Sequence, residues 1–370
     1  MGTIPNNWDL MSIMALTYFK GMHYNECLKI INRYSNYDEF KYNAFNLRQG
    51  DFFEKQDKKE LTNIQIAEKQ LELAHKFNYQ IISIWDDSYP ALLKEIDFSP
   101  IILYVHGKLQ HTNAFSISVV GTRKNTNYGT LATEHFVKEF VKNNIIITSG
   151  MATGIDRISH KTAMNNEGIT YAVIASGLDK ILPNIAKQFA QEIVNSGGAI
   201  ISEYKIGTSA MQGYFLQRNR IISGISKATL IVESAYKGGA LNTANFAGLY
   251  NRDVFAIPGS IFSEKSEGTN NLIYKNKSII ANSPQQILKE LQITPMEFEE
   301  NIKNDKSYYN QTLSENAQII FNLISMEPIH IDSIFEQSNL DISECLIQLL
   351  ELEFSDMIKQ LPGKYYIRGC

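Results

Sequence analysis

Hydrophobic residues between about positions 115 and 290 gather in short continuous runs instead of alternating with polar residues. Strands that are buried on both faces of a parallel sheet carry such runs. Segments with helical spacing, each about 10–15 residues long, separate the runs, as crossover helices do. The pattern predicts an α/β fold with a Rossmann-like, doubly wound parallel sheet, whose ligand site lies beyond the carboxyl ends of the strands. The predicted strands are residues 117–120, 145–148, 171–175, 199–201, 229–232 and 254–257.

The N-terminal region follows a different period. Apolar residues recur every three or four positions over residues 10–16 and 27–31, which predicts helices. Short β-branched runs at residues 80–85 and 100–105 are bounded by turn residues and predict strands. The predicted domains are an N-terminal helical domain over residues 1–75 and a Rossmann-like domain over residues 76–293.

A polar, weakly periodic stretch separates this region from the C-terminus and is interpreted as a linker. Three helical patterns follow it, and then two short strands around a Pro-Gly turn. Three helices and a β-hairpin in so short a segment describe a winged helix. The predicted bounds are 294–312 for the linker, 313–370 for the winged-helix domain, 316–325, 331–337 and 342–353 for its helices, and 357–367 for the hairpin.

The composition is that of a globular protein, with 44% hydrophobic and 20% charged residues. The few cysteines fit a reducing compartment. No apolar run approaches the roughly 18 residues that span a bilayer, and no signal peptide is visible, so we expect a cytoplasmic protein without membrane association. Cys27, Cys345 and Cys370 are few and far apart, which argues against a disulfide framework and against a zinc site.

The formal net charge of −4 argues against a surface coated with basic residues for duplex DNA, because affinity for nucleic acid depends on neutralising phosphates. A nucleic-acid site must therefore be a focused cluster, and residues 215–221 are the strongest candidate. Arg218 and Arg220 can each fork onto phosphate oxygens, and Asn219 adds a donor and an acceptor. Phe215 can stack on a base, at about 1–3 kcal/mol. The same pattern also fits a surface helix with solvated arginines and one core phenylalanine.

Small and polar residues follow four of the predicted strands. They let backbone amides approach an anion, and each following helix offers its positive N-terminal end. Gly121, Thr122 and Arg123 form the first such turn, and the Arg123 side chain can project toward the same groove. Asp156 is interpreted as a supporting residue that caps a helix or holds an arginine in place. The turns are residues 120–123, 149–156 with Ser149 and Gly150, 176–179, and 237–243 with Gly239.

Motifs of enzymatic chemistry are missing. There is no Gly-x-x-x-x-Gly-Lys-Ser/Thr loop, and residues 121–129 break the dinucleotide fingerprint, so no nucleotide cofactor is expected. His-x-x-x-His, Cys-x-x-Cys and Gly-x-Ser-x-Gly patterns are absent, so neither a metal centre nor a serine hydrolase is expected. A lone histidine such as His160 is more often a hydrogen-bonded structural residue than a base.

A series of short segments follows in a fixed order along the central region. They are Val-Gly-Thr-Arg at 120, Ser-Gly-Met-Ala-Thr-Gly-Ile-Asp at 149, His160, Ser-Gly-Leu-Asp at 176, Ser-Glu-Tyr at 202, Phe215 with Arg-Asn-Arg-Ile-Ile-Ser at 218, Val-Glu at 232, Gly-Ala-Leu-Asn-Thr-Ala at 239 and Arg-Asp-Val-Phe-Ala-Ile-Pro-Gly at 252. Taken in order, these segments resemble the DNA-processing protein A family, also called Smf, over residues 80–290. The C-terminal segments Pro328-Ile-His-Ile-Asp and Leu361-Pro-Gly-Lys-Tyr are similar to the winged helix of that family.

The resemblance implies a protein without enzymatic activity that binds single-stranded DNA, protects incoming strands during natural transformation and loads the RecA recombinase. It also implies a homodimer formed through the Rossmann-like domain. The phosphate-holding residues would be Gly121, Thr122 and Arg123, and the same pocket would be lined by Phe215, Arg218, Asn219 and Arg220, while Lys187 matches a position where the family often carries a basic residue.

The chain departs from the family pattern at two places in the central region. The usual Ser-Gly-Ser-Leu is replaced by residues 238–241, Gly-Gly-Ala-Leu, and a Tyr-Pro pair is replaced by Leu182-Pro183. The N-terminal helices resemble the helix-hairpin region of the family only loosely.

Two other functions compete with this interpretation. One is a nucleotide N-glycosidase related to phosphoribohydrolases, but aligning its glycine loop on Gly238 and Gly239 puts Phe246 where the catalytic glutamate belongs. The other is a regulator that binds duplex DNA through the helix at 342–353. Glutamates on that helix repel phosphate, which favours a protein partner for the small domain.

Overall fold

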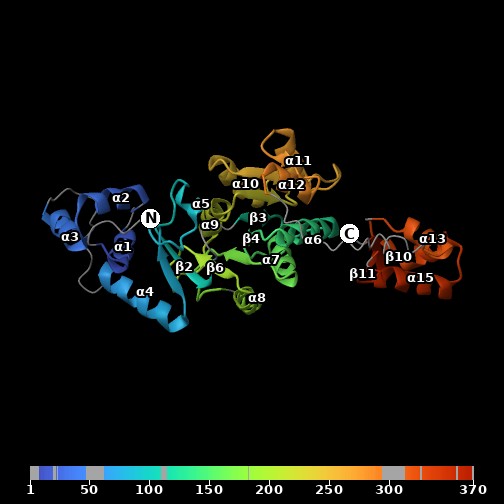
Figure 1. The fold of residues 1–370 in the computed structure, drawn as a ribbon, viewed down its shortest axis with the longest axis horizontal. Coiled ribbons are helices and arrows are strands. Elements are labelled where there is room, and N and C mark those ends of the chain that lie inside the picture. Colours follow the sequence, from blue (N-terminus) through green and yellow to red (C-terminus); the bar gives the residue numbers. More distant parts are fainter. Residues whose placement is uncertain are drawn as a thin grey trace. The chain divides into compact units, whose positions relative to one another are not determined.

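The computed structural model describes residues 8–19, 22, 24–46, 62–109, 115–181, 183–293, 313–325, 327–355 and 357–368. The chain divides into two compact units, Met1–Thr294 and Pro295–Cys370 (Figure 1). The predicted linker at 294–312 lies outside the described residues, and a separate domain ending at residue 75 stays a prediction.

The described part of the larger unit is built on a nine-stranded sheet with the order β1-β2-β6-β5-β4-β3-β7-β8-β9. Neighbours from β6 to β9 pair in parallel, and β1 and β2 add an antiparallel edge. The predicted Rossmann-like α/β fold is thus confirmed. The strands are β1 (Gln80–Ser83), β2 (Ile102–Gly107), β3 (Ser116–Val120), β4 (Ile146–Ser149), β5 (Thr170–Val173), β6 (Ala199–Ser202), β7 (Ala228–Ile231), β8 (Asp253–Ala256) and β9 (Ile279–Ile280).

The strand order reverses once inside the parallel part. The chain lays down β3, β4, β5 and β6 toward one edge, then returns to the centre and continues with β7, β8 and β9 toward the other edge. Since β3 and β7 are neighbours, the loops that leave them run to opposite sides. A crevice opens at such a switch point, beyond the carboxyl ends of the strands.

Helices cover both faces of the sheet (Figure 1). Successive strand residues point to opposite faces, so Val119 joins the core under one layer and Val120 the core under the other. One layer contains α5 (Ala91–Lys94), α9 (Gln212–Ile225), α10 (Ala240–Leu249) and α11 (Glu267–Tyr274), and the other contains α6 (Asn127–Lys142), α7 (Ile155–Asn165), α8 (Asn184–Asn195) and α12 (Pro284–Glu290).

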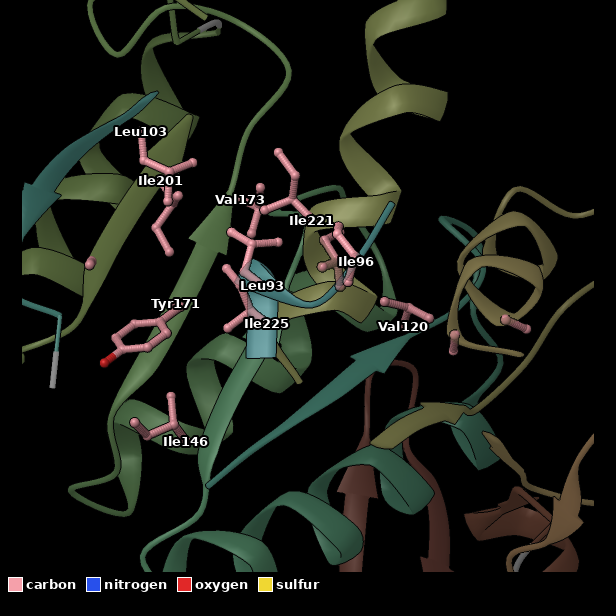
Figure 2. Packing of buried hydrophobic residues seen from close by; sticks show 14 of the residues in the cluster. Leu93, Ile96, Leu103, Val120, Ile146, Tyr171, Val173, Ile201, Ile221 and Ile225 are labelled. Carbon is pink, nitrogen blue, oxygen red and sulfur yellow. The ribbon is translucent and has the colours of Figure 1, made fainter. Parts of the chain in front are cut away.

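Helix α9 is held against the sheet by its C-terminal half. Ile221 and Ile225 are buried with Leu93 of α5 and with Ile96, which follows that helix, in the cluster that Figure 2 shows. A Cβ on Gly224 would lie 2.9 Å from side-chain atoms of both Leu93 and Ile96, so glycine is what lets the two helices approach closely. This packing fixes the direction in which the N-terminal half of α9, residues 212–220, leaves the core.

The N-terminal helices share a core with the edge of the sheet. The Gln70 side chain on the last of them is buried and exchanges two hydrogen bonds with the backbone of Ile206, donating at 3.1 Å and accepting at 2.8 Å. The helical region therefore belongs to the same compact unit as the sheet. Its helices are α1 (Leu10–Thr17), α2 (Tyr24–Arg33), α3 (Tyr37–Asn46) and α4 (Asn63–Phe77).

The smaller unit is the predicted winged helix, with three helices and a three-stranded sheet in the order β10-β12-β11. Buried Ile320, Ile334 and Leu349 form part of a core of its own. Among the described residues of the whole chain, no helix is long and apolar enough to cross a membrane. The elements are α13 (Glu315–Leu323), β10 (Ile329–His330), α14 (Ile331–Ser338), α15 (Ile342–Phe354), β11 (Ile358–Leu361) and β12 (Tyr365–Arg368).

Candidate functional site

A pocket of about 400 Å³ opens at the switch point of the sheet. Four chain segments meet there: the turn after β3, the segment from β4 into α7, the loop after β7 that leads into α10, and the N-terminal half of α9. We call it the switch-point pocket. Its lining residues include Gly121, Thr122, Arg123, Ala152, Asp156, Phe215, Leu216, Arg218, Asn219, Ser234, Ala235, Gly238, Gly239 and Thr243.

The turn after β3 is locked between its neighbours. A Cβ on Gly121 would lie 2.6 Å from Ile155 Cγ1 and 3.1 Å from the carbonyl oxygen of Glu233. The Thr122 amide donates to that same carbonyl at 2.8 Å, and the Thr122 carbonyl accepts from the amide of Ile155 at 3.2 Å. There is therefore no room for a side chain at Gly121. The hydrogen bonds of Thr122 hold the turn in place, and the turn fixes where Arg123 lies.

Arg123 and Phe215 face each other across the mouth of the pocket. The guanidinium carbon lies 5.7 Å from the centre of the phenyl ring, within the range of a cation–π contact. Arg123 is exposed and Phe215 keeps 38% of its surface accessible. An exposed cation and an exposed aromatic face thus stand side by side, which allows one ligand to contact both.

Arg218 forms the floor of the pocket and is 4% exposed. Its Nη1 donates to the carbonyl of Gly150 at 2.6 Å and to that of Val173. Burial lowers the pKa of Arg218 to about 10, while the nearby Asp156 carboxylate acts to raise it. Arg218 therefore remains charged at neutral pH, with Nη1 committed to two backbone carbonyls and Nε buried without a hydrogen-bond partner.

Asp156 lies in the first turn of α7, is buried, and lines the same pocket as Arg218. Desolvation raises its pKa, and the Arg218 guanidinium opposes that rise. Its carboxylate accepts from the amide of Ala152 at 3.3 Å. Asp156 thus opposes the charge of Arg218 from within the same pocket lining, and its supporting role stays a prediction.

The other predicted supporting residues surround this floor. Ser149 is buried and donates to the Val119 carbonyl at 2.7 Å. A Cβ on Gly150 would lie 2.4 Å from Arg218 Nη1, so a side chain there would displace the guanidinium. Gly239 lines the pocket at the N-terminus of α10, and a Cβ there would meet nothing within 4 Å.

His160 lies outside the pocket lining, fully buried in α7. Its Nδ1 is 2.6 Å from the Thr170 hydroxyl. Burial, with a smaller contribution from Arg218, lowers its pKa to about 3, so the ring is neutral at physiological pH. His160 therefore packs as a structural residue behind Arg218.

Arg220 does not line the switch-point pocket, which corrects the expectation that it would stand there with Arg218. It pairs with Glu203 and lines a second pocket on the other side of α9. Residues two apart on a helix point about 200° apart, so Arg218 and Arg220 cannot share a face. Lys187 is exposed on α8 and also lies outside the lining of the switch-point pocket.

The sequence did not single out several lining residues, among them Ser234 and Ala235. Ser234 and Ala235 follow the end of β7, so the rule that ligands bind beyond strand ends at the switch point could have found them. Leu216 and Ile222 carried no signal, because an apolar residue on a helix is normally read as core.

The chain is similar to known proteins over most of its length. Residues 80–292 match the family described as DNA recombination-mediator protein A, and residues 309–364 match the DprA winged helix domain. Protein Smf of Escherichia coli is 34% identical over 292 residues, which are 78% of this chain and 77% of that protein.

Two solved structures show the same similarity. DNA processing protein A from Streptococcus pneumoniae has a TM-score of 0.59 at 30% identity, covering 76% of this chain and 97% of that one. DNA processing protein A from Helicobacter pylori, described for its single-stranded DNA binding mode, has a TM-score of 0.51 at 28% identity, covering 58% of this chain and 95% of that one.

Proposed function

The chain belongs to the DNA recombination-mediator protein A family, and from that premise we propose that it binds single-stranded DNA in its switch-point pocket. The observation that supports the pocket is the pair of Arg123 and Phe215 at its mouth. The guanidinium can take a phosphate while the neighbouring ring stacks on a base. The binding mode described for the Helicobacter pylori relative is consistent with this proposal.

Two backbone features add to the attraction for phosphate. Helix α10 begins at the pocket with Gly239 and Ala240, so its positive end faces the bound anion. The small residues Gly238 and Gly239 keep the backbone accessible there. Single strands are preferred over duplex because only unpaired, unstacked bases offer a face to Phe215.

A binding assay tests the proposal directly. Labelled single-stranded oligonucleotides and the matching duplex are titrated with wild-type protein and with Arg123→Ala at several salt concentrations. We expect single-strand preference and a loss of affinity in Arg123→Ala, with the slope of log K against log salt smaller by about 0.7–1 because one phosphate contact is gone. The control is Lys124→Ala, which removes an exposed neighbouring charge outside the pocket lining. Equal affinity for duplex and single strand, or unchanged binding in Arg123→Ala, contradicts the proposal.

The cellular role that we infer is protection of incoming strands in natural transformation and loading of the RecA recombinase onto them. It predicts that the protein shields single strands from nuclease and shortens the lag of RecA filament assembly, and that Arg123→Ala loses both effects together. We also infer a homodimer through the Rossmann-like domain, which light scattering of the purified chain tests. If the Arg123→Ala variant still loads RecA, the RecA role does not depend on the switch-point pocket.

We infer a mediator rather than a nucleotide N-glycosidase. Phe246 occupies the position of the glycosidase carboxylate and stacks on Tyr250, with ring centres 6.0 Å apart and an angle of 15°. A stacked ring supplies no proton transfer at that place. Release of free base from a nucleoside monophosphate by the purified protein would contradict this assignment.

A further inference from the structure

A second pocket, of about 470 Å³, lies on the opposite side of α9 from the switch-point pocket. It is formed where the N-terminal helices, the start of β2, the loop after β6 and α9 meet. Aromatic side chains dominate its walls, so we call it the tyrosine pocket. They are Tyr18, Tyr24, Phe98, Tyr104, Tyr204 and Tyr214.

Two of these rings already form a stack. Tyr204 and Tyr214 lie with ring centres 4.2 Å apart and planes inclined by 25°. Both rings line the pocket, so a third flat ring can extend the stack from the pocket side. This is the arrangement with which proteins hold nucleobases of any sequence.

The polar groups of the tyrosine pocket suit a base with its phosphate. Glu203 and Arg220 neutralise each other as an ion pair, which leaves the exposed Lys205 as the uncompensated charge in the lining. The Lys205 ammonium lies 5.2 Å from the centre of the Tyr18 ring, at the wall of the pocket, where it can reach a phosphate.

The ion pair also carries unused hydrogen-bonding capacity. Among the described residues, Glu203 Oε1 and Arg220 Nη1 are buried without a hydrogen-bond partner. The pair therefore serves as a neutral, buried wall of the pocket, and the contacts that remain for a ligand are the aromatic rings and the Lys205 ammonium.

The two pockets are close enough to share one strand. Tyr214 and Phe215 are consecutive residues of α9, one lining each pocket. The pockets are separated by about one helix diameter, roughly 10 Å, which is about three stacked nucleotides. At the start of α9, Gly213 is exposed and a Cβ on it would meet nothing within 4 Å, which leaves a strand free to pass over the helix end.

We propose that the tyrosine pocket is a second nucleotide site, in which a base extends the Tyr204–Tyr214 stack and Lys205 contacts its phosphate. The ligand is a nucleotide, either of the strand held in the switch-point pocket or free in solution. If the nucleotide belongs to a bound strand, the proposal rests on the proposed function. The ability of the tyrosine pocket to take a nucleotide does not depend on that function.

The first arm of the test measures affinity for oligonucleotides of increasing length. In wild-type protein the affinity rises by about tenfold once a strand is long enough to add the base in the tyrosine pocket, which is the effect of one stacked base. Tyr214→Ala abolishes that step but leaves the affinity for the shortest binding strand unchanged, whereas Tyr214→Phe retains the step. Tyr274→Ala is the matched control, because Tyr274 is 84% exposed and lines neither pocket.

The second arm identifies the source of the nucleotide. Strands that carry 5-iodouracil are photocrosslinked, and the adducts are mapped by mass spectrometry; a strand in the site gives adducts on Tyr204 or Tyr214. Titration with dAMP and dGMP tests the free nucleotide, and binding that Tyr214→Ala abolishes assigns the site to that source. A length series unaffected by Tyr214→Ala, together with no mononucleotide binding, overturns the proposal.

The two arms also distinguish a failure of the second-site proposal from a failure of the proposed single-strand binding. If strands bind with an Arg123-dependent affinity but without the Tyr214-dependent step, only the second site is wrong. If no single strand binds at all, the proposed function is wrong, and the mononucleotide titration still decides whether the tyrosine pocket takes a nucleotide.

Discussion

The substitution Arg218→Met is expected to destabilise the larger unit strongly, although Arg218 belongs to the same sequence motif as Phe215, which we propose as a binding residue. Methionine keeps most of the volume of arginine but removes the guanidinium that donates to Gly150 and Val173 and balances Asp156. Hydrogen bonds from charged donors contribute about 1.5–3 kcal/mol each, so losing the two to Gly150 and Val173 should cost about 3–6 kcal/mol. The loss of the charge that opposes Asp156 acts in the same direction.

Urea unfolding followed by tryptophan fluorescence measures this loss in the larger unit alone. The protein has 2 tryptophans, Trp8 and Trp85, and both precede the winged helix. With an m value of about 3 kcal/mol/M, the midpoint falls by about 1–2 M. Arg123→Met is the control: it removes an exposed arginine of the same pocket and changes stability by no more than about 0.5 kcal/mol.

The pH dependence identifies the buried charge as the cause. Burial raises the pKa of Asp156 in the folded protein, and removing Arg218 raises it further because the opposing attraction is lost. The folded variant then holds the Asp156 proton to a higher pH than the unfolded chain does, so its deficit in stability is greatest at neutral pH and shrinks as the pH falls and Asp156 becomes protonated. The double variant Arg218→Met with Asp156→Asn should recover part of the loss. Equal midpoints for Arg218→Met and Arg123→Met, or a deficit that does not depend on pH, would refute this reasoning.

The remaining predictions concern two glycines and one histidine. Gly121→Ala forces a Cβ to within 2.6 Å of Ile155 and should cost about 1–3 kcal/mol by urea unfolding, with weaker single-strand binding; Gly239→Ala, whose Cβ has open space, should stay within about 0.5 kcal/mol of wild type. His160 has a pKa near 3 in the folded protein against about 6.5 unfolded, so its contribution to stability is complete above about pH 6.5 and is lost as the pH falls toward 3. His160→Gln should therefore flatten the acid side of the stability profile; an unchanged profile contradicts this cause.

The sequence predicted the sheet, the winged helix and the position of the pocket because each depends on local pattern. Continuous apolar runs mark strands buried on both faces, and small residues at strand ends mark the crevice where the order reverses. It could not predict that Arg218 is buried. The guanidinium is held inside by the carbonyls of Gly150 and Val173, and only the folded chain brings those distant residues next to α9. It did not predict the tyrosine pocket either, because its rings come from segments far apart in the sequence.

Helix α9 shows how a chain with a net charge of −4 can present a basic site. The face that includes Ile221 and Ile225 anchors the helix in the core, and on the remaining surface the two arginines diverge. Arg218 is balanced by Asp156 beneath one pocket, and Arg220 is balanced by Glu203 in the other. These arginines shape the walls of the pockets, and the exposed charge at the mouth of the first one comes from Arg123, on a rigid turn after another strand. Binding strength should therefore follow Arg123, and folding stability should follow Arg218, although a sequence motif of arginines suggests the reverse.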